Sequence, residues 1–189
     1  MAMTETKSLA NHFLIAMPSL EDPNFSHTVT YICEHTAAGA MGIVINRPLR
    51  ITFGEVLEHM QITPGAHVDV DLPVLAGGPV QGEHGFVLHS PPGQWNSSIS
   101  ISDAIAVTTS RDILMALADG KGPTRYLLTL GYAGWAAGQL EREMAENAWL
   151  SGPADAHILF DLPLEERWRA AAALIGIDLN LLSTEVGHA

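Results

Sequence analysis

The sequence contains little cysteine and little positive charge. Its 189 residues include one Cys, and nine Lys and Arg stand against 21 Asp and Glu, for a formal net charge of −12. One cysteine excludes an intramolecular disulfide framework and a zinc site built from cysteines alone. The acidic balance disfavours direct nucleic-acid binding, because phosphate contacts need Lys and Arg. The basic residues are dispersed, and Arg167 and Arg169, beside two glutamates, are interpreted as a solvated helix face.

The sequence also lacks an apolar run of the ~20 residues that would span a bilayer. Its first ten residues are polar and do not have the pattern of a signal peptide. We therefore expect a cytoplasmic protein without a membrane partner. Hydrophobic residues make up 47% of the chain and charged residues 16%, which is typical of a globular fold and not of a disordered chain. The length predicts one domain over residues 1–189, with residues 1–10 as a flexible N-terminal tail.

Short apolar or alternating runs predict strands over the first two thirds of the chain. The predicted strands are residues 12–17, 27–34, 41–46, 69–75, 85–89, 98–102, 105–108 and 125–130. In the second of them, Val29, Tyr31 and Cys33 share one face by the period of two, so we expect Cys33 to be buried and to have no redox role. Residues 98–102 alternate Ser and Ile strictly, which predicts a strand with one dry face.

Apolar residues at helical spacing predict four helices, over residues 52–60, 110–119, 136–147 and 163–175. Thr52 and Glu55 have the spacing of a capping box at the start of the first. Gly120 is expected to end the second. The strands come in hairpin-like groups and the helices are fewer, so the pattern favours an α+β fold with a mixed sheet.

Polar side chains gather where a predicted strand meets the second helix. These candidate ligand-binding residues are Thr108, Thr109, Ser110 and Arg111. A helix N-terminus offers unpaired N–H groups and partial positive charge, so hydroxyls and a guanidinium there suit a phosphate or carboxylate. In the alternative interpretation Thr109 or Ser110 only caps the helix, and Asp112 complements its dipole.

Three other places are candidates for ligand contact. Gly77 and Gly78 follow a predicted strand and allow close backbone approach, either to a ligand or in a structural turn. Residues 131–135 are interpreted as a second glycine-rich turn, between a strand and a helix. Asn147 falls on the apolar face of the third predicted helix, where it either contacts a ligand together with Glu143 or caps the helix end.

Taken in order along the chain, the motifs resemble those of the AlgH/YqgE family of small bacterial proteins, whose biochemical function is uncharacterised. The matching stretches include residues 12–18 (HFLIAMP), 31–35 (YICEH), 39–48 (GAMGIVINRP), 77–80 (GGPV), 108–112 (TTSRD), 131–135 (GYAGW), 146–150 (ENAWL) and 158–161 (ILFD). The resemblance implies a single α+β domain whose bifurcated sheet is partly closed as a small barrel, flanked by about four helices. Some members are labelled transcriptional regulators, and the family supplies no catalytic residues to carry over.

The function expected from the sequence is that of a regulatory or interaction protein, and not of an enzyme. It would bind a small ligand, anionic at residues 108–111, or a protein partner, and Glu34, Asn46 and Arg47 join the candidate ligand-binding residues. A regulator acting directly on DNA is the first alternative, which the charge of −12 disfavours. A hydrolase or transferase around Glu34, Asn46, Arg111 and Glu143 is the second. No metal-ligand spacing or cofactor motif occurs, so neither a metal nor a cofactor is expected.

Overall fold

The computed structural model of the chain describes residues 7–186, with side chains described as far as Leu182. Its strands are β1 (His12–Ala16), β2 (Val29–Thr36), β3 (Gly39–Val44), β4 (Pro48–Thr52), β5 (Pro73–Ala76), β6 (Val80–Ser90), β7 (Ser98–Ser100), β8 (Ala106–Thr108), β9 (Arg125–Ala136) and β10 (Trp149–Pro153). Its helices are α1 (Phe53–His59), α2 (Arg111–Ala118), α3 (Gln139–Ala145), α4 (Arg167–Leu174) and α5 (Leu179–Val186), with short turns η1 (His157–Asp161) and η2 (Leu164–Glu166) before α4. None of these helices is both long and apolar enough to cross a membrane.

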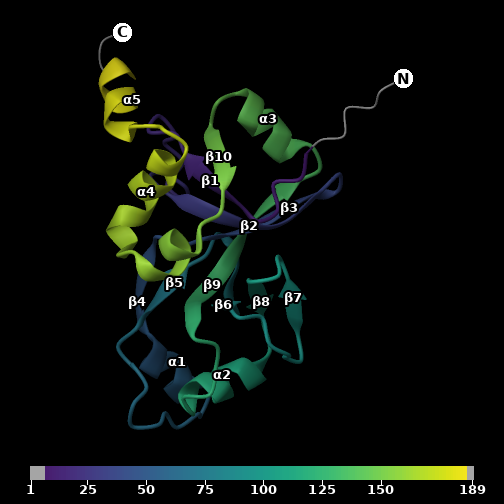
Figure 1. Cartoon of the computed structure of the whole chain (residues 1–189), viewed down its shortest axis with the longest axis vertical. Helices are drawn as coiled ribbons and strands as arrows, with labels where there is room; N and C mark the ends of the chain where they lie inside the picture. The colour runs from purple at the N-terminus through teal and green to yellow at the C-terminus, as the bar shows by residue number, and fades with distance from the viewer. Residues whose placement is uncertain (1–6, 187–189) are drawn as a thin grey trace.

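All ten strands join one sheet, in the order β10-β1-β2-β3-β9-β6-β8-β7, while β4 pairs with β5 and β5 pairs with β9. The β5–β9 pair is parallel, and the other pairs are antiparallel. The long strand β9 runs from the lower half of the molecule into its centre, so both halves of the sheet share it (Figure 1). The sheet is curled as a half-barrel, which confirms the predicted α+β fold with a mixed, partly closed sheet. The described residues hold five α-helices where about four were predicted.

The interpretation of residues 131–135 as a strand-to-helix turn is wrong, because these residues lie within β9. Gly131 has a φ of +77°, and a Cβ there would stand 2.4 Å from the carbonyl oxygen of Gly78. Only glycine tolerates that combination, and it lets β9 bend and continue. Beyond the bend the strand pairs with β3, and the helix α3 begins only at Gln139.

Side chains alternate between a central core and two outer clusters. Phe13 and Ile15 of β1 belong to the central core, whereas Leu14 between them packs with α3 on the other face. In β6, Phe86 belongs to the central core and Val87 to a cluster with α1 and α2. The central core also contains residues of α4. Because side chains alternate along a strand, β1 and β6 each pack against the central core on one face and against an outer cluster on the other.

Several predicted elements need correction. Residues 98–102 have no dry face along the strand that forms, because β7 is the last strand of the sheet and all three of its residues are exposed. The strand predicted over residues 69–75 contributes only its end, to β5, and the sequence did not predict β4 or β10. The capping box of α1 is confirmed, since the Glu55 N–H donates to Thr52 Oγ1 at 3.3 Å.

The two arginines of α4 differ, and the solvated-face interpretation is wrong for Arg167. Arg169 is exposed, but Arg167 is only 4% exposed. Its Nε donates to the Leu162 carbonyl at 3.0 Å, and its Nη1 donates to the Ile45 carbonyl at 2.8 Å. Burial lowers the pKa of the guanidinium to about 10, with the nearby Asp161 acting the other way. The side chain therefore links α4 to the residue that follows β3 by a hydrogen bond.

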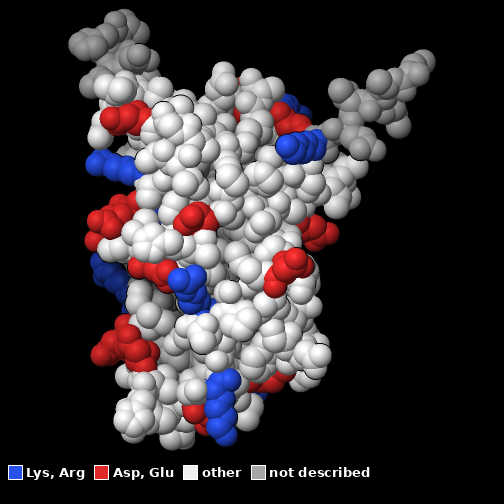
Figure 2. All heavy atoms as spheres, in the orientation of Figure 1, with Lys and Arg blue, Asp and Glu red and all other residues white. Residues whose placement is uncertain are grey.

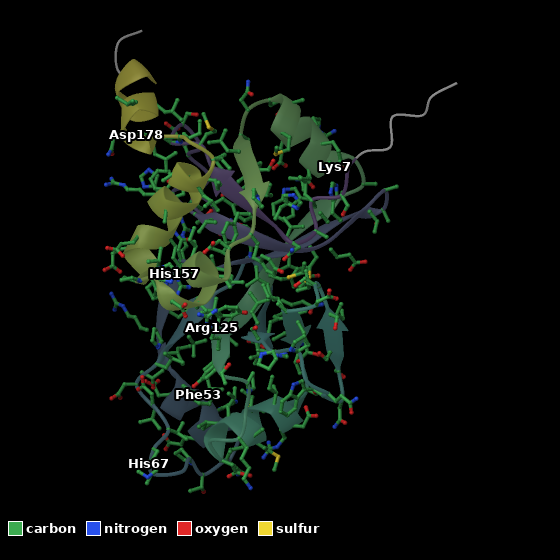
Figure 3. All side chains as sticks on the ribbon, viewed as in Figure 1. Lys7, Phe53, His67, Arg125, His157 and Asp178 are labelled. Carbon is green, nitrogen blue, oxygen red and sulfur yellow. The ribbon has the colours of Figure 1, made fainter. Side chains whose placement is uncertain are left out.

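The start of β9 is joined to η1 by an ion pair. Arg125 Nη2 donates to Asp161 Oδ2 at 2.8 Å, and His157 Nδ1 lies 3.4 Å from the same oxygen. Figure 3 labels Arg125 and His157 where the ribbon passes from the lower half to the helices of the upper half. The side chains of Arg125 and His157 are largely exposed, so we expect this cluster to add little stability.

Two buried threonines offer a matched test of hydrogen bonding in the core. Thr30 Oγ1 has no partner within the described residues, whereas Thr129 Oγ1 donates to the Phe86 carbonyl at 3.0 Å. Valine keeps the shape and removes the hydroxyl, so we expect Thr30→Val to stabilise and Thr129→Val to destabilise the fold, each by about 1 kcal/mol. Urea denaturation of both variants measures this. Equal losses in the two variants would contradict the assignment.

Cys33 is buried as predicted, and this burial makes the fold sensitive to alkali. Burial, with a smaller contribution from Glu34, raises the pKa of the thiol to about 12. An unfolded thiol ionises near pH ~8.5. The stabilising contribution is therefore complete below that pH and is lost as the pH rises toward the folded pKa, at about 1.4 kcal/mol per pH unit.

We expect the free energy of unfolding of the wild-type chain to fall more steeply between pH 9 and 10 than that of Cys33→Ala, by about 1.4 kcal/mol per pH unit. Guanidinium denaturation at closely spaced pH values gives both slopes. The pKa of Tyr31 is raised by burial and, to a smaller degree, by Cys33; the effect of burial is common to both chains and cancels in the comparison. Parallel slopes would show that the thiol ionises alike in both states.

Candidate functional site

The predicted residues Thr108 and Thr109 form hydrogen bonds to other parts of the protein, within and beside the hairpin of β7 and β8. Burial lowers the pKa of His89, so its ring is neutral, and Nδ1–H donates to the Pro91 carbonyl. Nε2 is then the acceptor for the Thr108 hydroxyl at 2.7 Å, and the Ser98 hydroxyl lies 3.0 Å beyond. The Thr109 N–H donates to a carbonyl of the segment entering β7. Thr108 is fully buried, so its hydroxyl faces the protein interior.

Ser110 and Arg111 lie at the start of α2 and differ in their contacts. Ser110 Oγ accepts the Ser97 N–H at 3.0 Å and donates to Asp112. The carboxylate of Asp112 also accepts the Asn96 N–H at 2.8 Å, so an acidic group of the chain itself lies in the first turn of the helix. Arg111 is exposed. The four predicted residues are thus neighbours, and Thr109 and Arg111 are the two of them that are exposed.

Asn46 and Arg47 hold the segment that leads into β2. Asn46 Oδ1 accepts the Val29 N–H at 3.0 Å, and its Nδ2 donates to the His27 carbonyl at 2.9 Å. Arg47 Nη2 donates to the Ser26 carbonyl at 2.8 Å. These bonds compensate for the backbone groups that the turn removes from the sheet ladder.

Gly77 and Gly78 lie where the chain crosses β9. A Cβ at Gly77 would stand 2.4 Å from the Gly131 carbonyl oxygen, and one at Gly78 would stand 2.1 Å from the carbonyl carbon of Tyr132. The close approach that the sequence predicted is therefore made to another strand. Asn147 follows α3 with a φ of +59° and is exposed, the geometry that the helix-cap interpretation requires.

Glu34 is the predicted residue that lines a hollow, which we call the trough. Its lining residues come from four strands and are Glu34, Thr36, Ala38, Gly39, Ala40, Met41, Val80, Gln81, Phe86, Tyr132, Gly134 and Trp135. The strand register places Glu34 opposite Met41, and Met41 opposite Gly134. Residues paired in register share one face of a sheet, so carboxylate, thioether and glycine lie in one row.

The floor of the trough is aromatic and only partly covered. The rings of Phe86 and Tyr132 meet edge to face with centroids 5.7 Å apart, and Tyr132 and Met41 are half-buried. The volume of about 630 Å³ lies within the range of ligand sites in proteins. Glu34 is the exposed charge on the wall, so the trough combines an apolar floor with one acidic group.

A second hollow, of about 1070 Å³, lies on the other side of the β2–β3 hairpin. Within it the His35 ring contacts Glu141 through Nε2, while its Nδ1 accepts the Leu9 N–H at 2.9 Å. Since Nδ1 accepts, Nε2 carries the proton and donates it to the carboxylate. That hydrogen bond holds the pKa of Glu141 below its usual range. Figure 3 shows Lys7 beside α3 at this hollow.

The last residues of the predicted tail, near Leu9, thus contact the sheet. Leu9 packs with the α3 cluster and bonds to His35, while the remainder of that prediction, over residues 1–6, lies outside the described residues. His35 and Glu141 come from β2 and α3, far apart in sequence. No spacing motif signals the pair, which explains why sequence reasoning missed it.

The structure does not bring the predicted residues to one place. Glu34 lies in the trough, Asn46 at the entry to β2, Arg111 at the start of α2, and Glu143 between two tryptophans. Sequence reasoning missed Met41 and the aromatic floor of the trough, although their alternation along the strands is visible in the sequence. Among the described residues, no three His, Cys, Asp or Glu side chains are close enough to hold a metal ion.

Comparison with known proteins agrees with this fold. A family model described as AlgH-like matches residues 13–180. A protein of Thioalkalivibrio sulfidiphilus, named as UPF0301, is 59% identical over 187 residues, which cover 99% of this chain and 100% of the relative. A relative from Nitrosococcus oceani, also UPF0301, is 56% identical over 179 residues, 95% of this chain and 96% of its own.

Two solved structures resemble the model. The solution structure of AlgH from Pseudomonas aeruginosa is 49% identical, covers 100% of both chains and superposes with a TM-score of 0.78. A crystal structure from Corynebacterium diphtheriae is 18% identical with a TM-score of 0.74, covering 96% of this chain and 94% of its own, and shows the fold alone. The family match and these identities agree over nearly the whole length, and the chain therefore belongs to the AlgH-like, UPF0301 family.

Proposed function

We propose that the protein is a cytoplasmic binding protein, with a regulatory or interaction role, that holds a small ligand or a segment of a protein partner in the trough. The observation that carries the proposal is the floor of the trough, where the half-buried Met41 and Tyr132 lie over the buried Phe86, beside the carboxylate of Glu34. Apolar and aromatic surface with few polar groups is the common composition of ligand sites. Met41 has a flexible side chain that adapts to a bound surface, and Tyr132 offers a rigid ring that is ordered at low entropic cost.

The charge of the trough favours a ligand that presents a hydrogen-bond donor or a cation to Glu34. A carboxylate repels an anion and attracts an ammonium or guanidinium, more strongly when the surroundings exclude water. An anionic ligand, which the sequence also suggested, would instead be expected near the exposed Arg111. Glu34 lies on β2 and Arg111 at the start of α2, so one titration separates the two sites.

Binding is favoured over catalysis because the polar groups proposed for chemistry are engaged elsewhere. Asn46 bonds to the backbone at both ends of its amide, and Glu143 accepts hydrogen bonds from two indoles. General acid–base catalysis needs such groups within reach of a single reacting atom. Of the four residues proposed for catalysis, only Glu34 lines the trough, and a single carboxylate there suits recognition of a ligand.

Direct DNA binding is the alternative that the regulator label of some relatives suggests. Figure 2 shows Lys and Arg side chains separated by acidic and uncharged ones on the face in view. A chain of charge −12 without a basic stripe lacks the electrostatic attraction that supplies non-specific binding. A mobility shift of duplex DNA at low salt would overturn the preference for indirect regulation.

The test is an NMR titration of the ¹⁵N-labelled chain. The ligands are a panel of aromatic amines, guanidines, phosphates and carboxylates, followed by short basic and acidic peptides. We expect amide shifts at Met41 and Tyr132 from donor-bearing compounds, weakened at least several-fold in Glu34→Gln. Glu58→Gln, an exposed carboxylate on α1, is the control and should bind as wild type. Shifts confined to Arg111, or none across the panel, would count against the trough.

A further inference from the structure

We propose that β7 pairs with the β7 of a second copy of this chain, forming an antiparallel dimer across its free edge. Among the described residues β7 pairs with β8 on one side only and ends the sheet. Figure 1 shows it at the outer side of the lower half, with no element beyond it. Its Ile99 is 60% exposed, high for a residue of this type. This surface is separate from the trough and does not depend on the proposed function.

The hydrogen-bond pattern fixes which backbone groups of β7 face outward. The Thr109 N–H donates to the Ser97 carbonyl, and the Ile101 N–H donates to the Ile105 carbonyl. Residues in an antiparallel ladder alternate, so odd-numbered residues bond to β8 and even-numbered ones turn their backbone away. The N–H and C=O groups of Ser98 and Ser100 therefore point out of the sheet. These groups are free to donate hydrogen bonds to another strand and to accept hydrogen bonds from it.

The sequence of β7 reads the same in both directions, which suits a two-fold axis. Ser98, Ile99 and Ser100 form a palindrome, Ser-Ile-Ser. An axis through Ile99 pairs Ser98 of one copy with Ser100 of the other, and each such pair exchanges two hydrogen bonds. Ile99 then lies opposite its own counterpart at a position without hydrogen bonds, where side chains approach most closely.

The charges around β7 permit this pairing in an acidic chain. Two copies of net charge −12 repel one another over most of their surfaces. From residue 85 to residue 102 there is no Lys, Arg, Asp or Glu, so the paired residues of β7 themselves carry no like charges. At the ends, the Asp112 carboxylate lies against Asn96, next to Arg111 in the chain, and antiparallel pairing brings that end toward Asp103 of the second copy. Arg111 then attracts Asp103 and Asp112 repels it, which limits the pairing to β7 itself.

The symmetry also limits the assembly. Pairing about a two-fold axis uses the free edge of β7 in each of the two copies, so the contact closes as a dimer and does not propagate into a fibre. A three-residue strand pair buries less than the ~1,200 Å² of a stable interface. We therefore expect a weak dimer that forms and dissociates with concentration.

The first test is sedimentation equilibrium of the full chain from micromolar to millimolar concentration. We expect the wild type to pass reversibly from monomer to dimer, and Ile99→Lys to weaken the association at least tenfold. Leu174→Lys on α4, where the leucine is 49% exposed, is the matched control and should associate as wild type. Circular dichroism confirms that each variant is folded. A monomer throughout, or a dimer unaffected by Ile99→Lys, would overturn the proposal.

The second test reads the register. At the central pair the two Cβ atoms stand ≈ 4.5–5.5 Å apart, close to disulfide distance. Under mild oxidation by oxidised glutathione, Ile99→Cys should form a covalent dimer at least tenfold faster than Leu174→Cys. Equal rates in the two variants would mean that the copies meet only by random collision, and would contradict the proposed axis.

Discussion

Replacing Arg167 by methionine is expected to lower the free energy of unfolding by about 3 kcal/mol, measured by urea denaturation. The guanidinium donates to the carbonyls of Leu162 and Ile45; the first bond is part-buried and the second is buried, and the side chain is only 4% exposed. Methionine fills most of the volume but donates no hydrogen bond. The buried carbonyl of Ile45 and the part-buried carbonyl of Leu162 then lose their partner, and a bond from a charged donor contributes about 1.5–3 kcal/mol.

A second effect opposes this loss. Burial lowers the pKa of Arg167 to about 10, so the folded protein holds the charged form at a cost that methionine removes. The described ion pairs do not include Arg167, so the substitution strands no carboxylate. We expect the unpaired carbonyls to outweigh the relief, because the bond to the Ile45 carbonyl is buried and that to the Leu162 carbonyl is part-buried.

Arg169→Met is the matched control, since that arginine is exposed two residues away on α4. Its effect should stay within ±0.5 kcal/mol, as for most surface substitutions. If the two variants lose the same small amount, the buried guanidinium contributes only packing. A stabilised Arg167→Met would mean that the cost of its charge dominates.

These arginines illustrate what the sequence could and could not predict. Period-two and helical spacing correctly placed β1, the β2–β3 hairpin, α1, α2 and the apolar stripe of α4. Local periodicity shows which face of an element is apolar, but not what lies opposite a polar residue at its margin. Arg167 follows two glutamates, a pattern typical of solvent-facing helices, and only the chain fold brings two carbonyls to it.

The errors in β7 and β9 have the same origin. Alternation in residues 98–102 is a true strand signal, but whether the isoleucine face is covered depends on the position of the strand in the sheet. The glycines of residues 131–135 are typical of a turn, yet a strand that changes partners needs the same conformational freedom at Gly131. The trough could not be predicted because its residues come from four strands and meet through register alone.

Removing the carboxylate of Glu143 is expected to cost about as much as removing Arg167. Glu143 Oε1 accepts the indole N–H groups of Trp135 at 3.2 Å and Trp149 at 3.0 Å, and Oε2 accepts Gln139 Nε2 at 2.9 Å. Both tryptophans are buried, so their N–H groups have no access to water as a substitute. Glu143→Ala should therefore lower the free energy of unfolding by about 3 kcal/mol.

Graded variants separate the carboxylate from the volume it occupies. In Glu143→Gln the amide oxygen still accepts from the indoles and only the bond from Gln139 is lost, so we expect a loss of about 1 kcal/mol. Glu146→Ala, an exposed carboxylate beside the same helix end, should change stability by less than about 0.5 kcal/mol. Urea denaturation followed by tryptophan fluorescence reports on the indoles directly. The carboxylate on α3 joins the helix to Trp135 of β9 and Trp149 of β10. An alanine variant as stable as the glutamine variant would therefore show that packing alone holds α3 against the sheet.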